Sequence, residues 1–85
     1  MTKKYNKLSR TINFNKIEQD LKNTNNNIVI NTYKNFCIYL NLYIHTSAIY
    51  KEKQLKLLEN ILDFTYDNNT YNYTISGIKY TKIAV

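Results

Sequence analysis

The sequence predicts a small α+β domain with the element order α-β-β-α-β-β, in which a mostly antiparallel four-stranded sheet carries both helices on one face. Three patterns support this fold class: alternating apolar residues over 36–45, a helical apolar pattern over 47–64, and a hairpin pattern over 70–84. With 85 residues, the chain forms a single domain (1–85) with one thin core.

Residues 36–45 are expected to form the central strand. Apolar residues alternate with others over ten positions, as a strand buried on one face requires. The inward positions are Phe36, Ile38, Leu40, Leu42 and Ile44, and the outward positions are Cys37, Tyr39, Asn41, Tyr43 and His45.

A short helix is expected to precede this strand, over residues 16–23. Asn15 has the side chain of an N-cap, and Glu18 follows three residues later, as in a capping box. Ile17 and Leu21 lie one turn apart and share the buried face. The asparagine-rich residues 24–27 end the helix.

Residues 28–32 are expected to form a second strand, joined to the central strand by a three-residue loop. This loop, residues 33–35, pairs Ile30 with Ile38 and Ile28 with Leu40, which places all four side chains on one face. The sequence therefore predicts a hairpin over residues 28–45.

Residues 47–64 are expected to form the second helix, with Ser47 as its cap. Glu52 and Lys56 form a correctly oriented i,i+4 pair on its solvent side. Apolar side chains occupy the other half of the helical wheel, at Ala48, Tyr50, Leu55, Leu57, Leu58, Ile61, Leu62 and Phe64.

The C-terminal segment is expected to form a hairpin of residues 70–75 and 78–84. The only glycine, Gly77, follows Ser76 where a two-residue turn needs positive φ. This turn pairs Tyr73 with Tyr80 on the apolar face of the sheet.

An alternative interpretation places a helix over residues 31–44. Tyr33, Phe36, Cys37, Leu40 and Ile44 also recur at helical spacing. The element order would then be winged-helix-like, with the C-terminal hairpin as the wing.

Charge is concentrated at the N-terminus, where we expect residues 1–11 to form a basic, flexible arm. The chain carries a net charge of +6, and Lys3, Lys4, Lys7 and Arg10 lie in this arm with no acidic residue. Asn, Ile, Lys and Tyr fill 45 of the 85 positions, which indicates a low-GC genome and reduces the weight of each lysine and tyrosine.

Catalytic and metal chemistry find little support in the sequence. A single glycine excludes a glycine-rich phosphate loop, and one cysteine and one histidine are too few for a structural zinc site. Cys37 and His45 would be roughly 26 Å apart on one strand, or about 12 Å apart in a helix, so they cannot form a catalytic dyad. We expect a soluble, cytoplasmic protein without enzymatic activity, cofactor, metal or membrane contact.

The outer face of the predicted sheet is the expected binding surface. Tyrosine and lysine on an open sheet can stack on bases and contact phosphates, or bury area against a protein. A homodimer formed through this face is a further possibility. The residues are Tyr39, Asn41, Tyr43, His45 and Lys79.

Size and composition together suggest a binding protein encoded by a phage or mobile element. We expect a stoichiometric inhibitor, anti-CRISPR-like in mode, of a host protein or ribonucleoprotein complex that handles nucleic acid or serves in defence. The alternative is a small basic regulator that binds RNA or DNA directly, through the basic arm together with Lys79 and Lys82.

Overall fold

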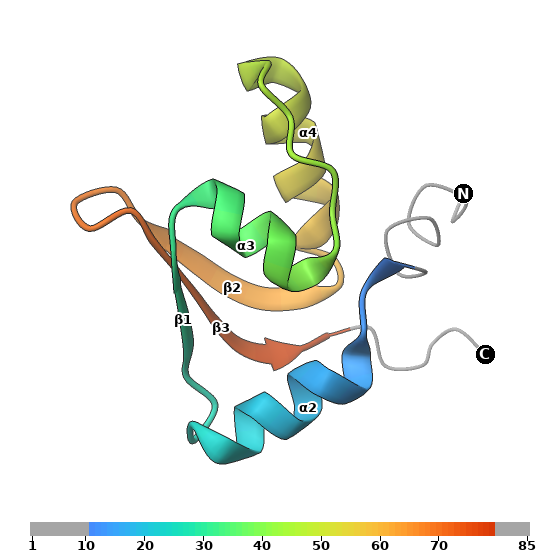
Figure 1. Ribbon diagram of the computed structural model, residues 1–85, viewed down its shortest axis with the longest axis vertical. Coiled ribbons are helices and arrows are strands. Elements are labelled where there is room, and N and C mark those ends of the chain that lie inside the picture. The colour runs from blue at the N-terminus through green and yellow to red at the C-terminus, as the bar shows by residue number, and fades with distance from the viewer. Residues whose placement is uncertain (1–10, 80–85) are drawn as a thin grey trace.

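The computed structural model describes residues 11–79, which form three helices and a three-stranded antiparallel sheet (Figure 1). The α+β class is confirmed, whereas the predicted four-stranded sheet is not formed within these residues. In chain order the elements are α2 (Phe14–Asn23), β1 (Ile28–Asn31), α3 (Tyr33–Leu40), α4 (Ala48–Leu58), β2 (Leu62–Asp67) and β3 (Asn72–Ile78).

The sheet has the strand order β1-β3-β2, and its two faces differ in character. Ile28 lies opposite Ile75, which in turn lies opposite Phe64, and these side chains face the core. One position along, Val29, Thr74 and Thr65 form the next cross-strand row, and Val29 is 51% exposed. One face is therefore apolar and covered, and the other is largely polar and open.

Helices α2 and α3 supply the side chains that cover the apolar face. Ile17 and Leu21 of α2 belong to the same buried cluster as Phe36 of α3. The Phe36 ring stacks on Tyr73 of the central strand, with centroids 4.3 Å apart and planes 15° apart. Each such fully buried side chain contributes on the order of 1.5–3 kcal/mol to stability, so this interface defines the position of α3 on the sheet.

The first predicted helix is confirmed with a shifted start. Helix α2 begins at Phe14, and the side chain of Asn13, rather than Asn15, caps it by accepting a hydrogen bond from the Lys16 backbone N–H. Ile17 and Leu21 are buried as predicted.

The predicted central strand over residues 36–45 is wrong. Phe36 and Cys37 are both fully buried although they are adjacent, which a strand buried on one face does not allow. They form the buried stripe of α3 with Leu40, one turn on, and Ile38 is 56% exposed. The predicted loop over residues 33–35 is consequently the first turn of α3, and its pairings with residues 28–32 are not formed.

The helix predicted over residues 47–64 begins as expected but ends at Leu58. A short turn follows, and Leu62 opens strand β2. Leu62 and Phe64 fit a strand as well as a helix, because two apolar residues two positions apart cannot separate the two patterns.

The predicted turn at Ser76 and Gly77 is also wrong. Gly77 lies inside β3 opposite Asp63, and Ser76 is an extra residue at a bulge in the ladder. The β2–β3 turn instead spans residues 68–71, where Tyr71 adopts a positive φ of 62°. The predicted Tyr73–Tyr80 pair is not formed, since Tyr73 pairs with Ile30 and Tyr66, and Tyr80 lies outside the described residues.

The observed order is helix, strand, helix, helix, strand, strand. This is the order that the alternative interpretation of residues 31–44 predicts. For residues 11–79 the predicted order α-β-β-α-β-β is therefore wrong, and the order is α-β-α-α-β-β.

Candidate functional site

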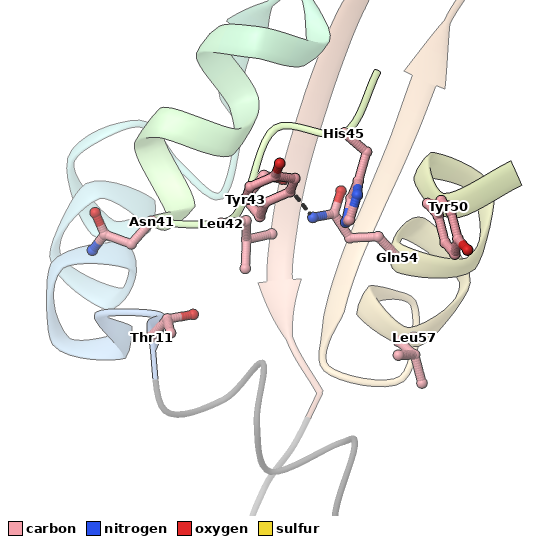
Figure 2. A pocket seen from close by; sticks show the side chains of 8 residues that line it. All are labelled: Thr11, Asn41, Leu42, Tyr43, His45, Tyr50, Gln54 and Leu57. Atoms are coloured by element: carbon pink, nitrogen blue, oxygen red, sulfur yellow. Dashed lines mark hydrogen bonds between the residues drawn. The ribbon is translucent and has the colours of Figure 1, made fainter. Parts of the chain in front are cut away.

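The connection between α3 and α4, residues 41–47, runs beside α4 and leaves an open groove of about 350 Å³ (Figure 2). Helix α3 ends at Asn41, which adopts the left-handed conformation with φ of 60°, and residues 42–46 form no helix or strand. The groove is lined mainly by apolar side-chain surface, from Thr11, Asn41, Leu42, Tyr43, His45, Tyr50, Gln54 and Leu57.

A buried polar network holds this connection against both helices. The Tyr33 hydroxyl of α3 donates to Gln54 Oε1 of α4 at 2.8 Å and accepts from the His45 backbone N–H at 3.0 Å. Gln54 Nε2 donates to the Tyr43 carbonyl oxygen at 2.8 Å. Gln54 is only 6% exposed, so these bonds satisfy a polar group that would be costly to bury unpaired. The network thereby joins α3, the connection and α4.

Burial raises the pKa of two side chains at this junction. The pKa of Tyr33 rises to about 12, mainly because burial disfavours the phenolate, although the His45 N–H acts in the opposite direction. The pKa of the Cys37 thiol is likewise raised by burial, and its sulfur lies 3.9 Å from Gln54 Oε1. Cys37 is thus a packed thiol within the core and lacks the features of a reactive nucleophile.

Three aromatic rings lie in a row along the groove. The Tyr43 and His45 centroids are 4.8 Å apart in an edge-to-face arrangement, and those of His45 and Tyr50 are 6.0 Å apart. Tyr43 is 74% exposed and Tyr50 is 58% exposed. Figure 2 shows these side chains around Gln54, with Tyr50 projecting from α4 and Tyr43 from the connection. The row offers ring faces and edges to a ligand.

Helix α4 also presents an exposed face beside the groove. Ile49, Lys53 and Lys56 recur at i, i+4 and i+7, on the side opposite the buried Gln54 and Leu58. The Lys53 ammonium lies 5.8 Å from the Tyr50 ring centroid, which places a cation next to the aromatic row.

Three of the predicted binding residues meet at this groove, although no sheet carries them. Asn41, Tyr43 and His45 all line it, from alternate positions of the connection. The predicted alternation of inward and outward side chains does not hold, because Cys37 is fully buried and Ile38 and Ile44 are exposed.

The other two predicted residues lie elsewhere. Tyr39 turns from α3 toward α2, where its hydroxyl donates to the Asp20 carboxylate and Lys16 Nζ lies 4.5 Å from its ring centroid. Burial, followed by this hydrogen bond, raises the pKa of Tyr39. Lys79 follows β3, and its ammonium donates to the Glu59 carbonyl oxygen at 3.0 Å. Tyr39 thus has a structural role that the strand interpretation missed.

The predicted basic arm lies outside the described residues, apart from Thr11, and so does Lys82. The described part, residues 11–79, contains seven lysines and six carboxylates, a net charge of +1 against +6 for the whole chain. Most of the positive excess is therefore carried by the terminal segments of the sequence.

Tyr33, Tyr50 and Gln54 were not among the predicted site residues. Gln54 leaves a signal in the sequence, since it lies four residues after Tyr50 and four before Leu58, within the apolar stripe of the helix. A polar side chain in such a stripe indicates a buried hydrogen-bonding partner. The sequence does not reveal the hydrogen-bonding partners of Gln54, because their positions depend on residues 33–40 forming a helix.

Among residues 11–79, no group of three His, Cys, Asp or Glu side chains is placed to hold a metal ion. No helix in the same range is long and apolar enough to span a membrane. Comparison with models of known protein families, with curated proteins and with solved structures finds no match. Arguments about function therefore depend on the geometry of this chain.

Proposed function

We propose that this chain is a small, non-enzymatic nucleic-acid-binding protein with a winged-helix-like arrangement. The observation that supports this most is the element order α-β-α-α-β-β combined with the antiparallel strand order β1-β3-β2. In a winged-helix arrangement α4 takes the position of the recognition helix, and the β2–β3 turn takes that of the wing. Fold order alone does not define function, so the surface of α4 must agree.

The exposed surface of α4 is compatible with contact to phosphates and base edges. Lys53 and Lys56 lie on the exposed face with Ile49, and Glu52 is the one acidic residue among the eleven of this helix. Figure 1 shows α4 projecting from the rest of the fold, which leaves its outer side open to a duplex. Lysine ammonium groups on such a helix attract the phosphate backbone.

The basic terminal residues support the same function from the sequence. A net charge of +6 in 85 residues favours association with a polyanion. Because this charge is borne mainly outside residues 11–79, we propose that α4 positions the duplex and that the N-terminal arm adds sequence-independent affinity.

The test is a titration of a fluorescent 20-base-pair duplex at several salt concentrations, with binding followed by anisotropy. The variant Lys53→Gln/Lys56→Gln should bind more weakly, and the slope of log K against log salt should become shallower by about 2, roughly one unit for each phosphate that the variant no longer neutralises. The matched control is Lys22→Gln/Lys34→Gln, which removes two exposed lysines from α2 and α3.

Two results would contradict the proposal. One is a wild-type protein that leaves the duplex unbound at low salt. The other is an equal loss of affinity in both double variants. It would show that affinity depends on total charge only and that α4 does not contact the duplex.

A protein-binding role is a second candidate, favoured by exposed apolar side chains near the groove. Ile49 is 65% exposed and Ile44 is 37% exposed, in addition to Tyr43 and Tyr50. Such a surface suits the expected inhibitor of a host nucleic-acid-handling or defence complex. Its complex with a protein partner should tolerate salt that dissociates a phosphate-bound complex. Size-exclusion chromatography with light scattering, in the presence of duplex or candidate partner at moderate salt, separates the two roles.

A further inference from the structure

Strand β1 forms an open edge of the sheet. Within residues 11–79 the strand order is β1-β3-β2, so no strand pairs with the outer side of β1, and Figure 1 shows β1 at the rim of the fold. Natural proteins commonly protect such an edge with charged side chains, proline or a bulge, because an exposed edge can pair with another chain. β1 has none of these features: its sequence is Ile-Val-Ile-Asn, and its register with β3 is unbroken.

The pairing with β3 determines which backbone groups of β1 point outward. The Thr32 N–H donates to the Tyr71 carbonyl oxygen at 2.8 Å, and the two residues continue the register of the strand pair. Hydrogen-bonded and non-hydrogen-bonded pairs alternate in an antiparallel ladder, so the backbone groups of Val29 and Asn31 point to the open edge. The Asn31 carbonyl oxygen accepts from Asn35 Nδ2 at 3.1 Å. The Val29 N–H and C=O and the Asn31 N–H are therefore the outward groups that suit a further strand.

These groups fit a second copy of β1 in antiparallel orientation. Opposite residues of an antiparallel pair lie on the same face, so a two-fold axis at Val29 places Val29 opposite its equivalent and Ile28 opposite Ile30 of the copy. The two Val29 residues then exchange both of their N–H···O bonds. Two positions along, the Asn31 N–H meets the Asn27 carbonyl oxygen of the copy. The edge is thus complementary to itself in both hydrogen bonding and side chains.

Charge also favours β1 over the other edge strand as the contact between copies. β2 carries Asp63 and Asp67, and its register with β3 shifts beside Asp63. Like charges and an irregular ladder both oppose pairing between two copies of β2. Residues 24–33, which contain β1, carry no charged side chain, although the whole chain has a net charge of +6. Two copies can therefore meet at β1 without bringing like charges together within this segment.

We propose that two copies of this chain associate through β1, so that their two three-stranded sheets form one continuous antiparallel sheet. The axis of this dimer passes at Val29, whose side chain is 51% exposed in the single chain and becomes covered by its equivalent. The proposal goes beyond the nucleic-acid function and does not rest on it, because β1 shares no residue with the exposed face of α4.

Size-exclusion chromatography with light scattering, over a series of protein concentrations, tests the association. The wild-type mass should rise from that of one chain, 10.2 kDa, toward twice this value. Val29→Lys should raise the dissociation constant by about tenfold or more, since two like charges would lie directly opposite each other at the axis. Thr65→Lys is the matched control, because Thr65 is also exposed and lies in the same cross-strand row, but on β2.

A disulfide cross-link tests the register of the two strands. The Cα atoms of a hydrogen-bonded antiparallel pair are about 5.5 Å apart, a separation that a disulfide spans. Diamide should therefore convert Val29→Cys to a covalent dimer on a non-reducing gel. Thr65→Cys should remain a single chain, and so should the wild type, because its Cys37 is fully buried.

Amide hydrogen exchange locates the interface in the wild-type protein and needs no variant. The outward amides of Val29 and Asn31 should exchange more slowly as the protein concentration rises, because each gains a hydrogen bond across the axis. The amides of α4 should exchange at the same rate at every concentration. Concentration-dependent protection confined to α4 or to residues 41–45 would place the interface elsewhere and overturn the proposal.

Two further results would overturn the proposal. A wild-type chain that stays monomeric at millimolar concentration excludes the dimer and leaves the β1 edge to an extended segment of another protein. A dimer that Val29→Lys and Thr65→Lys weaken equally is not centred on β1. Neither result affects the duplex proposal, which the Lys53→Gln/Lys56→Gln variant tests separately.

Discussion

Gln54 joins α3, the connection and α4 through the two ends of its side-chain amide. Its amide makes hydrogen bonds to Tyr33 and to the Tyr43 carbonyl oxygen in a site that is 6% exposed. Loss of one partner in such a site leaves another buried polar group unsatisfied, which costs more than the hydrogen bond itself contributes. The network is therefore a positional constraint on α4 rather than a source of large net stability.

Removal of the Tyr33 hydroxyl tests how much this hydrogen-bond network contributes to stability. Tyr33→Phe removes one hydroxyl and leaves Gln54 Oε1 and the His45 N–H without it, so the free energy of unfolding at pH 7 should fall by about 1–3 kcal/mol. Burial raises the folded-state pKa of Tyr33 to about 12, above its ordinary value of 10.0. Its contribution is complete below pH 10 and is lost between pH 10 and pH 12, since the unfolded state releases its proton first.

Urea unfolding at several pH values measures this prediction. The difference between wild type and Tyr33→Phe should be constant up to about pH 9 and should narrow between pH 10 and pH 12. Tyr71→Phe serves as the control, because Tyr71 is 60% exposed. A difference that stays constant through pH 12 would show that Tyr33 is not held neutral by burial.

At the scale of elements, residues 33–40 show why the pattern of apolar residues could not distinguish a helix from a strand. Alternate apolar positions satisfied a strand, and the spacing of Tyr33, Phe36, Cys37 and Leu40 satisfied a helix. Local caps favour the helix: the Thr32 hydroxyl accepts from the Asn35 N–H at 3.4 Å, and Asn41 takes the left-handed position at the other end. The stacking of Phe36 on Tyr73 then buries the helical stripe.

Strand β3 carries a prediction that separates the observed hairpin from the one expected from the sequence. Gly77 lies within the strand and has no positive φ, and an added Cβ would meet Asp63 Oδ2 at 3.5 Å, an ordinary contact. Gly77→Ala should therefore leave the unfolding midpoint unchanged or raise stability by about 0.5–1 kcal/mol, because alanine loses less backbone entropy.

Thermal unfolding followed by circular dichroism checks this result. A turn with positive φ at Gly77 would instead make the alanine variant less stable by about 1 kcal/mol or more. Ser76→Ala is a useful companion, because Ser76 occupies the bulge beside it and differs little in backbone freedom from alanine. A marked loss of stability for Gly77→Ala alone would argue for the turn.

For the whole molecule, charge is divided between a nearly neutral stretch, residues 11–79, and basic terminal sequence. Replacement of Lys3, Lys4, Lys7 and Arg10 by glutamine in the full chain lowers the net charge from +6 to +2. Duplex affinity should fall, and the salt slope should become shallower by up to about 4, since each replaced residue removes at most one phosphate contact. The urea midpoint of the same variant shows whether the loss of affinity comes with a loss of stability.

Anisotropy titrations and urea unfolding on the same preparation give both readouts. An unchanged salt slope would show that the N-terminal residues make no phosphate contact, and binding would then depend on α4 alone. The combination of this variant with Lys53→Gln/Lys56→Gln should be additive if arm and helix contact separate phosphates.

The sequence by itself determined the α+β class, the first helix, the place of strand β1 and the start of α4, because each has a local apolar pattern. The predicted caps were less accurate, since Asn13 caps α2 in place of Asn15 and Ser47 makes no side-chain capping hydrogen bond. It grouped Asn41, Tyr43 and His45 with Tyr39 and Lys79 on one sheet face, which the structure does not form. Only the tertiary structure decided that residues 33–40 are helical, that β2 begins at Leu62, and that Gln54 and Tyr50 complete the groove. The physical reason is that the local sequence of these segments fits a helix and a strand about equally well. Contacts between distant parts of the chain decide between the two: Phe36 packs on Tyr73, Gln54 bonds to Tyr33, and β2 pairs with β3.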